Sequence, residues 1–200
     1  MWDQVSREIE SSGRSIAVIS SELLWPCTEE EISYLSRSLS QHETKAIIFF
    51  REPFSYSVSS YKQRVKMDYR YSLRTHMQEQ VWRYDYTGIV RRWKKQISIV
   101  EMNYDSVKQN LFAAFSQQIG VELQGQRSDR LNVSPNDQAI MAARWINLFA
   151  SKYPKLRHRI QRQIFRQTVV GKILSFPFSF RKLNNRSNQQ YFEKLLESHL

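Results

Sequence analysis

The sequence is short of several residue types on which common protein classes depend. Its one cysteine, Cys27, excludes an internal disulfide framework and favours a reducing, cytoplasmic compartment. No apolar run approaches the roughly 20 residues of a membrane-spanning helix. The N-terminus, MWDQVSREIE, has neither the basic lead nor the apolar stretch of a secretory signal. The histidines are scattered, with no pair at ligand spacing, so we expect no metal site.

Glycine and acidic residues are also scarce in defined regions. Gly13 is the only glycine before Gly88, so the N-terminal part offers no glycine-rich phosphate-binding loop. No acidic residue stands between Asp137 and Glu193, where Lys and Arg supply eleven positive charges, equal to the formal net charge of +11. A basic surface of this kind, over residues 144–186, indicates an anionic partner such as a phosphate, an acidic polysaccharide, a nucleic acid or a membrane face.

Apolar residues make up 41% of the 200 residues, enough for the core of one domain. Helical and strand patterns alternate over residues 1–120, and the strands are apolar throughout, as in a parallel sheet covered by helices. We therefore predict an α/β core over 1–120 and a helical, basic part over 121–200, together one domain. The expected strands are 15–20, 45–50 and 97–102, and the expected helices are 2–12, 28–40, 54–67, 104–120, 136–151, 155–167 and 187–199.

The stretch KAIIFFREPFSYSVSSYKQ starts at Lys45 and combines a buried strand with a hydroxyl-rich helix. Arg51 ends the strand, and ligands of open α/β sheets bind beyond the carboxyl ends of strands, where helix N-termini point. A guanidinium and a helical serine could hold a phosphate from two sides. Alternatively, Arg51 pairs with Glu52 or another acid and the serines only solvate a helix.

Glu22 follows the first expected strand at Ser20 and Ser21. A carboxylate at that edge could act as a general base on a hydroxyl substrate. The alternative is a glutamate that caps a helix or forms a salt bridge.

In this order the motifs resemble the sulfotransferases that use 3′-phosphoadenosine 5′-phosphosulfate, in particular bacterial members related to carbohydrate sulfotransferases. The main motif is REPFSYSVSSY, from Arg51 to Tyr61, which is similar to the family's strand–loop–helix for the 3′-phosphate. Further similar pieces are YKQRVK at 61–66, Asp85-Tyr86 before Arg92-Trp93, Asn103-Tyr104-Asp105, Leu131-Asn132-Val133-Ser134, and Ser20-Ser21-Glu22.

The resemblance implies a P-loop-NTPase-like, mostly parallel sheet and transfer of a sulfuryl group to a hydroxyl or amine of a saccharide-type acceptor. It assigns Arg51 and Ser59 to the 3′-phosphate, Pro53 to the turn, and Glu22 to the role of base. The nucleotide serves as co-substrate, and no metal is implied.

Two departures from the family stand out. Tyr56 occupies a position where the family often has a second arginine, and the loop of the kind P-K-T-G-T-T that holds the 5′-phosphosulfate has no counterpart. Neither Lys45 nor Lys62 sits on a glycine-rich turn that could replace it. We therefore expect an N-terminally incomplete sulfotransferase fold that does not transfer sulfate unaided.

The competing hypothesis is a non-catalytic, anion-binding protein. In PKLRHRIQRQIFR, residues 154–166, Leu156, Ile160 and Ile164 form one helical stripe and arginines occupy the rest. Such a helix could lie on a nucleic acid backbone or an anionic membrane, or it could pack on the core with a solvated basic face. No motif for sequence-specific nucleic acid binding is present.

Overall fold

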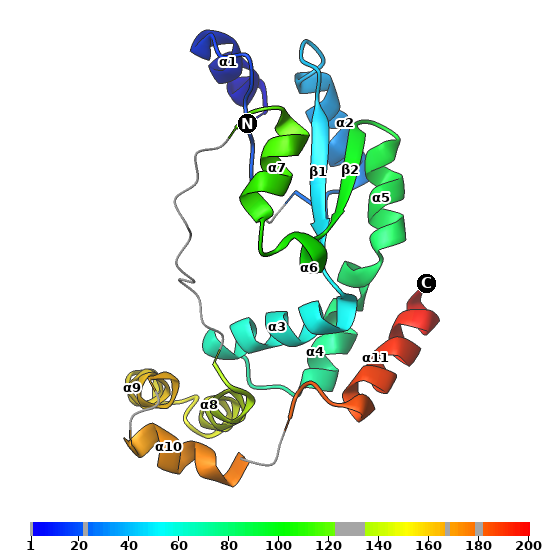
Figure 1. Ribbon diagram of the computed structural model, residues 1–200. Helices are drawn as coiled ribbons and strands as arrows, with labels where there is room; N and C mark the ends of the chain where they lie inside the picture. The colour runs from blue at the N-terminus through cyan, green and yellow to red at the C-terminus, as the bar shows by residue number, and fades with distance from the viewer. Residues whose placement is uncertain (1, 22–23, 123–134, 167–168, 179–181) are drawn as a thin grey trace. The chain divides into compact units, whose positions relative to one another are not determined.

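The computed structural model describes residues 2–21, 24–122, 135–166, 169–178 and 182–200, and Figure 1 shows its elements. The chain forms two compact units: unit 1 comprises Met1–Arg51 and Asp85–Gln124, and unit 2 comprises Glu52–Tyr84 and Gly125–Leu200. Residues 52–84 thus pack with the C-terminal helices.

Unit 1 contains α1 (Trp2–Ser12), α2 (Glu29–Ser38), β1 (Lys45–Phe50), α5 (Tyr86–Lys94), β2 (Ser98–Asn103), α6 (Tyr104–Val107) and α7 (Leu111–Ile119). Unit 2 contains α3 (Pro53–Lys66), α4 (Leu73–Gln80), the 3₁₀ helix η1 (Val81–Tyr84), α8 (Asp137–Phe149), α9 (Pro154–Phe165), α10 (Val169–Ser175), the 3₁₀ helix η2 (Phe176–Phe178) and α11 (Arg186–His199).

Unit 1 is built on a two-stranded parallel sheet. β1 pairs with β2 in a register that sets Lys45 opposite Ser98 and Phe50 opposite Asn103. Two of the three predicted strands are therefore confirmed. The protein is helix-rich and, at a coarse level, α/β.

The predicted strand at 15–20 is wrong. This segment is irregular, and among the described residues β1 pairs only with β2. The side chains of Ile16, Val18 and Ile19 are 44%, 54% and 41% exposed. An apolar run forms a strand only when a neighbouring strand satisfies its backbone groups and a second layer buries its side chains. Neither condition is met here.

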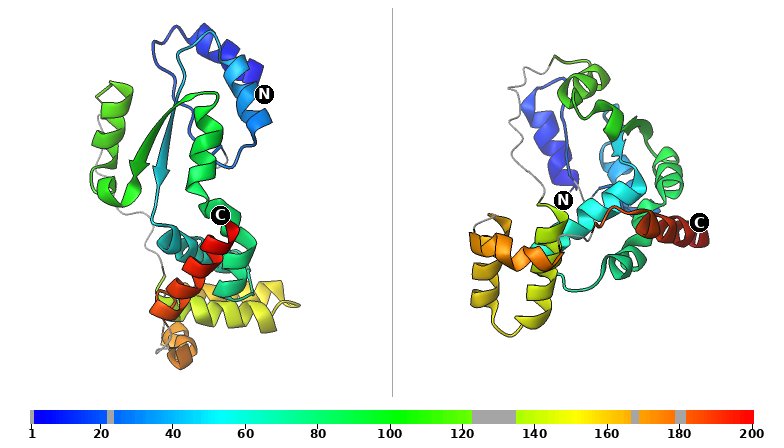
Figure 2. Two further views of the ribbon diagram at one scale, coloured as in Figure 1. Left: turned by 90° about the vertical axis from the view of Figure 1, so that its right-hand side faces the viewer. Right: turned by 60° about the horizontal axis from the view of Figure 1, so that its bottom comes forward.

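One face of the sheet carries the core of unit 1. Ala46 and Ile48 of β1 stand on the same face, because strand side chains alternate. They pack with Ile32 of α2 and with Ile89 and Trp93 of α5. In the left view of Figure 2, α7 lies on the opposite side of the sheet from α2 and α5.

Local capping signals fix several helix ends. Thr28 and Glu31 form the expected capping box at the start of α2, and Gly120 ends α7 at φ 69°, in the left-handed region. The expected single helix over 104–120 is wrong in one respect, because α6 and α7 are separate. The Asn103 side chain caps α6 by accepting from the backbone N–H groups of Asp105 and Ser106, and α7 restarts after Asn110.

Unit 2 is a helical assembly around α3. The buried face of α3 presents Phe54, Val58, Tyr61 and Val65 to residues of α4, α8 and α11. Among them, Phe192 of α11 is 2% exposed and contacts the Phe54 ring at a centroid distance of 6.0 Å. Burying side chains of this size stabilises the unit by about 1.5–3 kcal/mol each.

A buried amide fixes the turn after α3. Asn147 of α8 donates to the carbonyl oxygens of Val65, at 2.9 Å, and Tyr69, at 3.0 Å, and its own Oδ1 accepts from Gln161 of α9 at 2.5 Å. The turn includes Asp68, at φ 77°. One side chain therefore joins three segments of unit 2.

Over the parts of the chain described, no helix is both long enough and apolar enough to cross a membrane.

Candidate functional site

The carboxyl edge of the unit 1 sheet brings Arg51 and Tyr104 together. The two strands are parallel and end in register, so the residues that follow them lie at the same edge. The Arg51 guanidinium carbon lies 5.9 Å from the centre of the Tyr104 ring, within the range of a cation–π contact. Arg51 thus lies at the edge that its place directly after the strand indicates in the sequence.

Tyr86, at the start of α5, supports Arg51 from the backbone. Its hydroxyl donates to the Arg51 carbonyl oxygen at 2.9 Å, and its ring lies 4.6 Å from the Phe50 ring. The side chain of Asp85 caps α5 by accepting from Gly88 N at 2.8 Å, which fixes where Tyr86 begins the helix. The DYTG sequence carries this cap signal, but nothing in it pointed to a contact with Arg51.

No acidic side chain among the described residues neutralises the Arg51 guanidinium. Its Nε is buried and has no hydrogen-bond partner within the described chain, and none of the ion pairs there includes Arg51. The expected alternative, an ion pair with Glu52, is therefore not formed. Instead, the Glu52 carboxylate accepts from Phe54 N at 2.9 Å and Ser55 N at 2.6 Å, capping α3.

Ser59 lies on α3 in unit 2 and is half-buried. Because Arg51 belongs to unit 1, the convergence of Arg51 and Ser59 on one phosphate stays a prediction. Pro53 occupies the first turn of α3, where its missing N–H costs nothing. The Glu52 carboxylate already binds the N–H groups of that turn, so an anion at this helix end would compete with it.

The other predicted site residues either lie outside the described residues or are paired within the protein. Glu22 and residues 131–134 lie outside the described residues. Lys62, next to the motif, pairs with Asp137 at 2.7 Å and is thereby neutralised. In the described part of the chain, no group of three or more His, Cys, Asp or Glu side chains could hold a metal ion.

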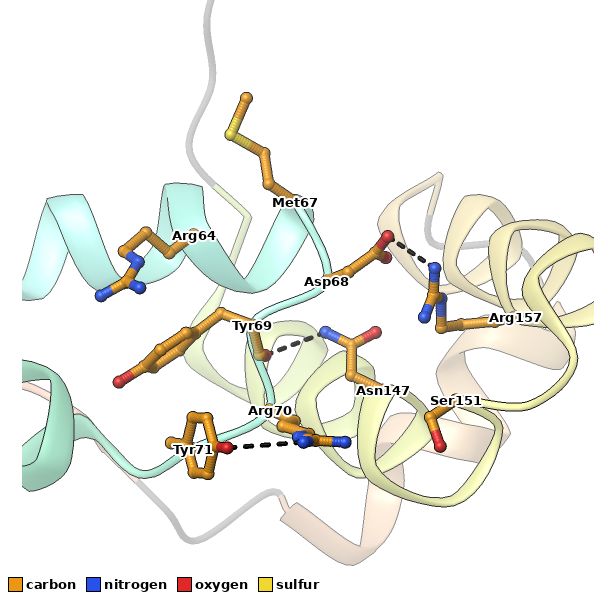
Figure 3. A pocket seen from close by; sticks show the side chains of 9 residues that line it. All are labelled: Arg64, Met67, Asp68, Tyr69, Arg70, Tyr71, Asn147, Ser151 and Arg157. Carbon is orange, nitrogen blue, oxygen red and sulfur yellow. Dashed lines mark hydrogen bonds and ion pairs between the residues drawn. The ribbon is translucent and has the colours of Figure 1, made fainter.

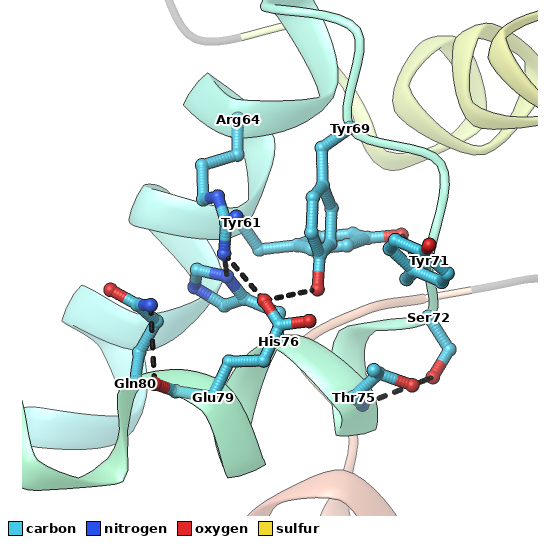
Figure 4. A network of polar contacts seen from close by, with 9 residues as sticks. All are labelled: Tyr61, Arg64, Tyr69, Tyr71, Ser72, Thr75, His76, Glu79 and Gln80. Carbon is cyan, nitrogen blue, oxygen red and sulfur yellow. Dashed lines mark hydrogen bonds and ion pairs between the residues drawn. The ribbon is translucent and has the colours of Figure 1, made fainter.

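A polar network around the buried His76 links α3 to α4 in unit 2, as Figure 4 shows. Arg64 donates to Glu79 at 2.9 Å and lies 3.3 Å from His76 Nδ1. The Tyr69 hydroxyl donates to the same Glu79 oxygen at 2.9 Å, and the Arg64 guanidinium lies 4.0 Å above the Tyr69 ring. Arginine can only donate, so His76 Nδ1 accepts and the ring is neutral.

The environment of His76 keeps it uncharged. The side chain is fully buried, and this burial, together with the positive charge of Arg64, lowers its pKa to about 4. Burial, then the carboxylate of Glu79, raises the pKa of Tyr69, so its phenol remains a donor. Arg64, Tyr69 and Glu79 satisfy one another, whereas the buried His76 Nε2 has no hydrogen-bond partner among the described residues. We interpret the network as structural.

A hollow of about 360 Å³ opens beside this network, lined by residues including Arg64, Asp68, Tyr69, Asn147 and Arg157. Figure 3 shows Asp68 and Arg157 facing each other, with a carboxylate oxygen 2.6 Å from the guanidinium. Since Arg64 pairs with Glu79, two of the three arginines in its lining are neutralised within the protein. The third, Arg70, donates to the Tyr71 hydroxyl at 3.4 Å, so this hollow offers an additional anion only one guanidinium outside an ion pair.

The basic helix α9 packs on unit 2 through part of its predicted stripe. Ile164 is buried and Ile160 packs beside it, whereas Leu156 is exposed. The cations on the remaining surface of α9 and at its end are exposed: Lys155, Arg159, Arg162 and Arg166. Of the two alternatives for this helix, α9 therefore fits the one in which it packs on the core and exposes a basic face, except that Leu156 is exposed.

Comparison of the chain with family models, with curated proteins and with solved structures found no match.

Proposed function

We propose that the protein binds a 3′-phosphorylated adenine nucleotide, of the 3′-phosphoadenosine 5′-phosphosulfate type, with Arg51 as the anchor of the 3′-phosphate. The observation that supports this most is the Arg51 guanidinium at the carboxyl edge of a parallel sheet. It is positioned by Tyr86 and Tyr104 and unneutralised by any described acid. A buried donor without a partner calls for an explanation, and a bound anion supplies one.

The wider proposal is a partial sulfotransferase fold with a P-loop-NTPase-like sheet. In it, Ser59 adds a hydroxyl to the phosphate, and Glu22 accepts the proton of a saccharide hydroxyl or amine as it attacks sulfur. Transfer also needs donors that stabilise the charge developing on the leaving phosphate. The sequence has no glycine-rich loop for that purpose. We therefore propose that this chain binds the nucleotide without transferring sulfate by itself.

The test is a calorimetric titration with the product nucleotide, 3′-phosphoadenosine 5′-phosphate. Arg51→Ala should weaken binding by roughly 1.5–3 kcal/mol, the usual contribution of hydrogen bonds to a charged group. The matched control is Arg91→Ala, which removes an exposed arginine from α5 in the same unit.

A second ligand shows whether the 3′-phosphate is the group recognised. Adenosine 5′-phosphate lacks it, so its affinity should be the same for the wild-type chain and Arg51→Ala. Equal binding of 3′-phosphoadenosine 5′-phosphate by both proteins would remove Arg51 from the site. Sulfate transfer by this 200-residue chain would refute the non-transferring part of the proposal.

A second candidate function rests on the exposed cations of α9, which join no ion pair within the described residues: Lys155, Arg159 and Arg162. They could bind an anionic polymer or membrane surface through its charge. Replacing Arg159 and Arg162 by Gln should lower the salt concentration at which the protein leaves a heparin column. Replacing Arg7 and Arg91 of unit 1 by Gln should lower this salt concentration less. An equal decrease would show that heparin binding depends only on the net charge and not on α9.

A further inference from the structure

A second hollow in unit 2, of about 450 Å³, differs from the first in its charge. It lies where α4 and α11 begin and where α8 passes, and Figure 1 labels these three helices of unit 2. Its lining includes Arg74 from α4, Arg144 from α8 and Lys182 from the segment before α11, and no carboxylate. These residues are separated along the chain and meet only in the folded unit.

The two arginines are held by uncharged partners. Arg144 Nε donates to the carbonyl oxygens of Arg70 and Tyr71, both at 3.1 Å. That arrangement orients its guanidinium and leaves the terminal amino groups without a partner among the described residues. Arg74 donates to the Ser187 hydroxyl at 3.0 Å, and its guanidinium lies 4.9 Å from the centre of the Tyr191 ring.

No described acid neutralises these cations. None of the ion pairs within the described ranges includes Arg74, Arg144 or Lys182. Asp137, whose carboxylate accepts from Leu183 N of the lining at 2.9 Å, is itself paired with Lys62 at 2.7 Å. Three like charges around one hollow repel each other, and an anion between them removes that cost.

We propose that this hollow binds the oxyanion of a phosphate or sulfate ester. The two arginines present planar N–H donors suited to adjacent oxygens of such a group, and Lys182 adds a movable point charge. Ser72 and Asn188 in the lining supply polar groups for the rest of the ligand. The volume falls in the range of small-molecule sites, about 300–1,000 Å³, so the hollow has room for the organic body of an ester.

This site is independent of the nucleotide site proposed at the sheet edge. All the lining residues belong to unit 2, whereas Arg51 belongs to unit 1. The two proposals can therefore fail separately.

The experiment is a calorimetric titration of the full chain, at neutral pH and low salt, with glucose 6-phosphate and with glucose 6-sulfate. We expect saturable binding of at least one ester and none of glucose. The ester that binds more tightly identifies the anion, and comparable affinities define a general oxyanion site. Absence of saturable binding for both esters would overturn the proposal.

Variants locate the binding. Arg74→Gln and Lys182→Gln remove exposed charges without opening the core, and each should weaken binding about tenfold, as expected for lost bonds to a charged group. Lys194→Gln removes an exposed charge of α11 in the same unit and should change the affinity less than twofold. Equal weakening by Lys194→Gln, or by Arg51→Ala, would place the ester elsewhere and refute the site.

Discussion

His76 should make unit 2 sensitive to mild acid. In the folded chain its pKa is lowered to about 4 by burial and then by Arg64, whereas the ordinary value is 6.5. The unfolded chain therefore takes up the proton at a higher pH than the folded chain. As the pH falls from about 6.5 towards 4, proton uptake by the unfolded state lowers the free energy of unfolding; above 6.5 this effect vanishes.

The size of the loss follows from the pKa difference. Each pKa unit corresponds to 1.36 kcal/mol, so the loss should be about 2 kcal/mol at pH 5 and about 3 kcal/mol near pH 4. The structural cause is specific. A proton on Nδ1 would break the contact in which Arg64 donates to it at 3.3 Å and would add a second positive charge beside the guanidinium.

The assay is urea denaturation followed by circular dichroism between pH 7 and pH 5, for the wild-type chain and for His76→Gln. Glutamine cannot titrate, so the variant should lose about 2 kcal/mol less than the wild type over this interval. His199→Gln, which removes an exposed histidine of α11, should behave as the wild type. Identical losses in the wild type and His76→Gln would refute the assignment of the acid sensitivity to His76.

Two further predictions concern stability at neutral pH. Asn147→Ala should lower the free energy of unfolding by about 3–5 kcal/mol, because buried partners at Val65, Tyr69 and Gln161 lose their hydrogen bonds; a loss below 1 kcal/mol in urea denaturation would contradict this. Gly120→Ala should cost about 1 kcal/mol through backbone conformation alone, since φ is 69° and no atom lies within 4 Å of the added Cβ; thermal denaturation indistinguishable from the wild type would disprove that cost.

The sequence predicts local structure where the signal is local. The apolar runs that became β1 and β2, the capping box at Thr28 and the helix end at Gly120 each depend on a few neighbouring residues. Helices α4 and α5 carried comparable signals in Ser72 and Asp85, whose side chains accept from Thr75 N and Gly88 N. Those caps could have been recognised.

Strand formation at 15–20 depends on contacts that no local pattern supplies. Residues 15–20 contain a run of four apolar residues, one fewer than β1, yet an isolated extended segment leaves its backbone groups unpaired. The split between α6 and α7 has a different origin, because a hydrophobic face can continue through a break in the backbone. The three residues Lys108–Asn110 form a turn there. The helical spacing of apolar residues over 104–120 gives no sign of this turn.

The candidate sites differ in how far the sequence could reach them. Parallel strands place their carboxyl ends together, so Arg51 and Tyr104 could be assigned to one edge without coordinates. The cluster of cations without acidic partners in unit 2 could not be predicted from the sequence in this way. The composition shows that the positive charge is concentrated in the C-terminal part. Anion binding, however, depends on which of these cations are not paired with an acid in the folded chain. The charge of Arg157 is neutralised by the carboxylate of Asp68, 89 residues away, whereas Arg144 is oriented by backbone carbonyls, which carry no opposing charge. Only the tertiary structure distinguishes these two arginines. For that reason, a basic segment in a sequence is weaker evidence for an anion site than an arginine, such as Arg144, that the structure shows outside any ion pair.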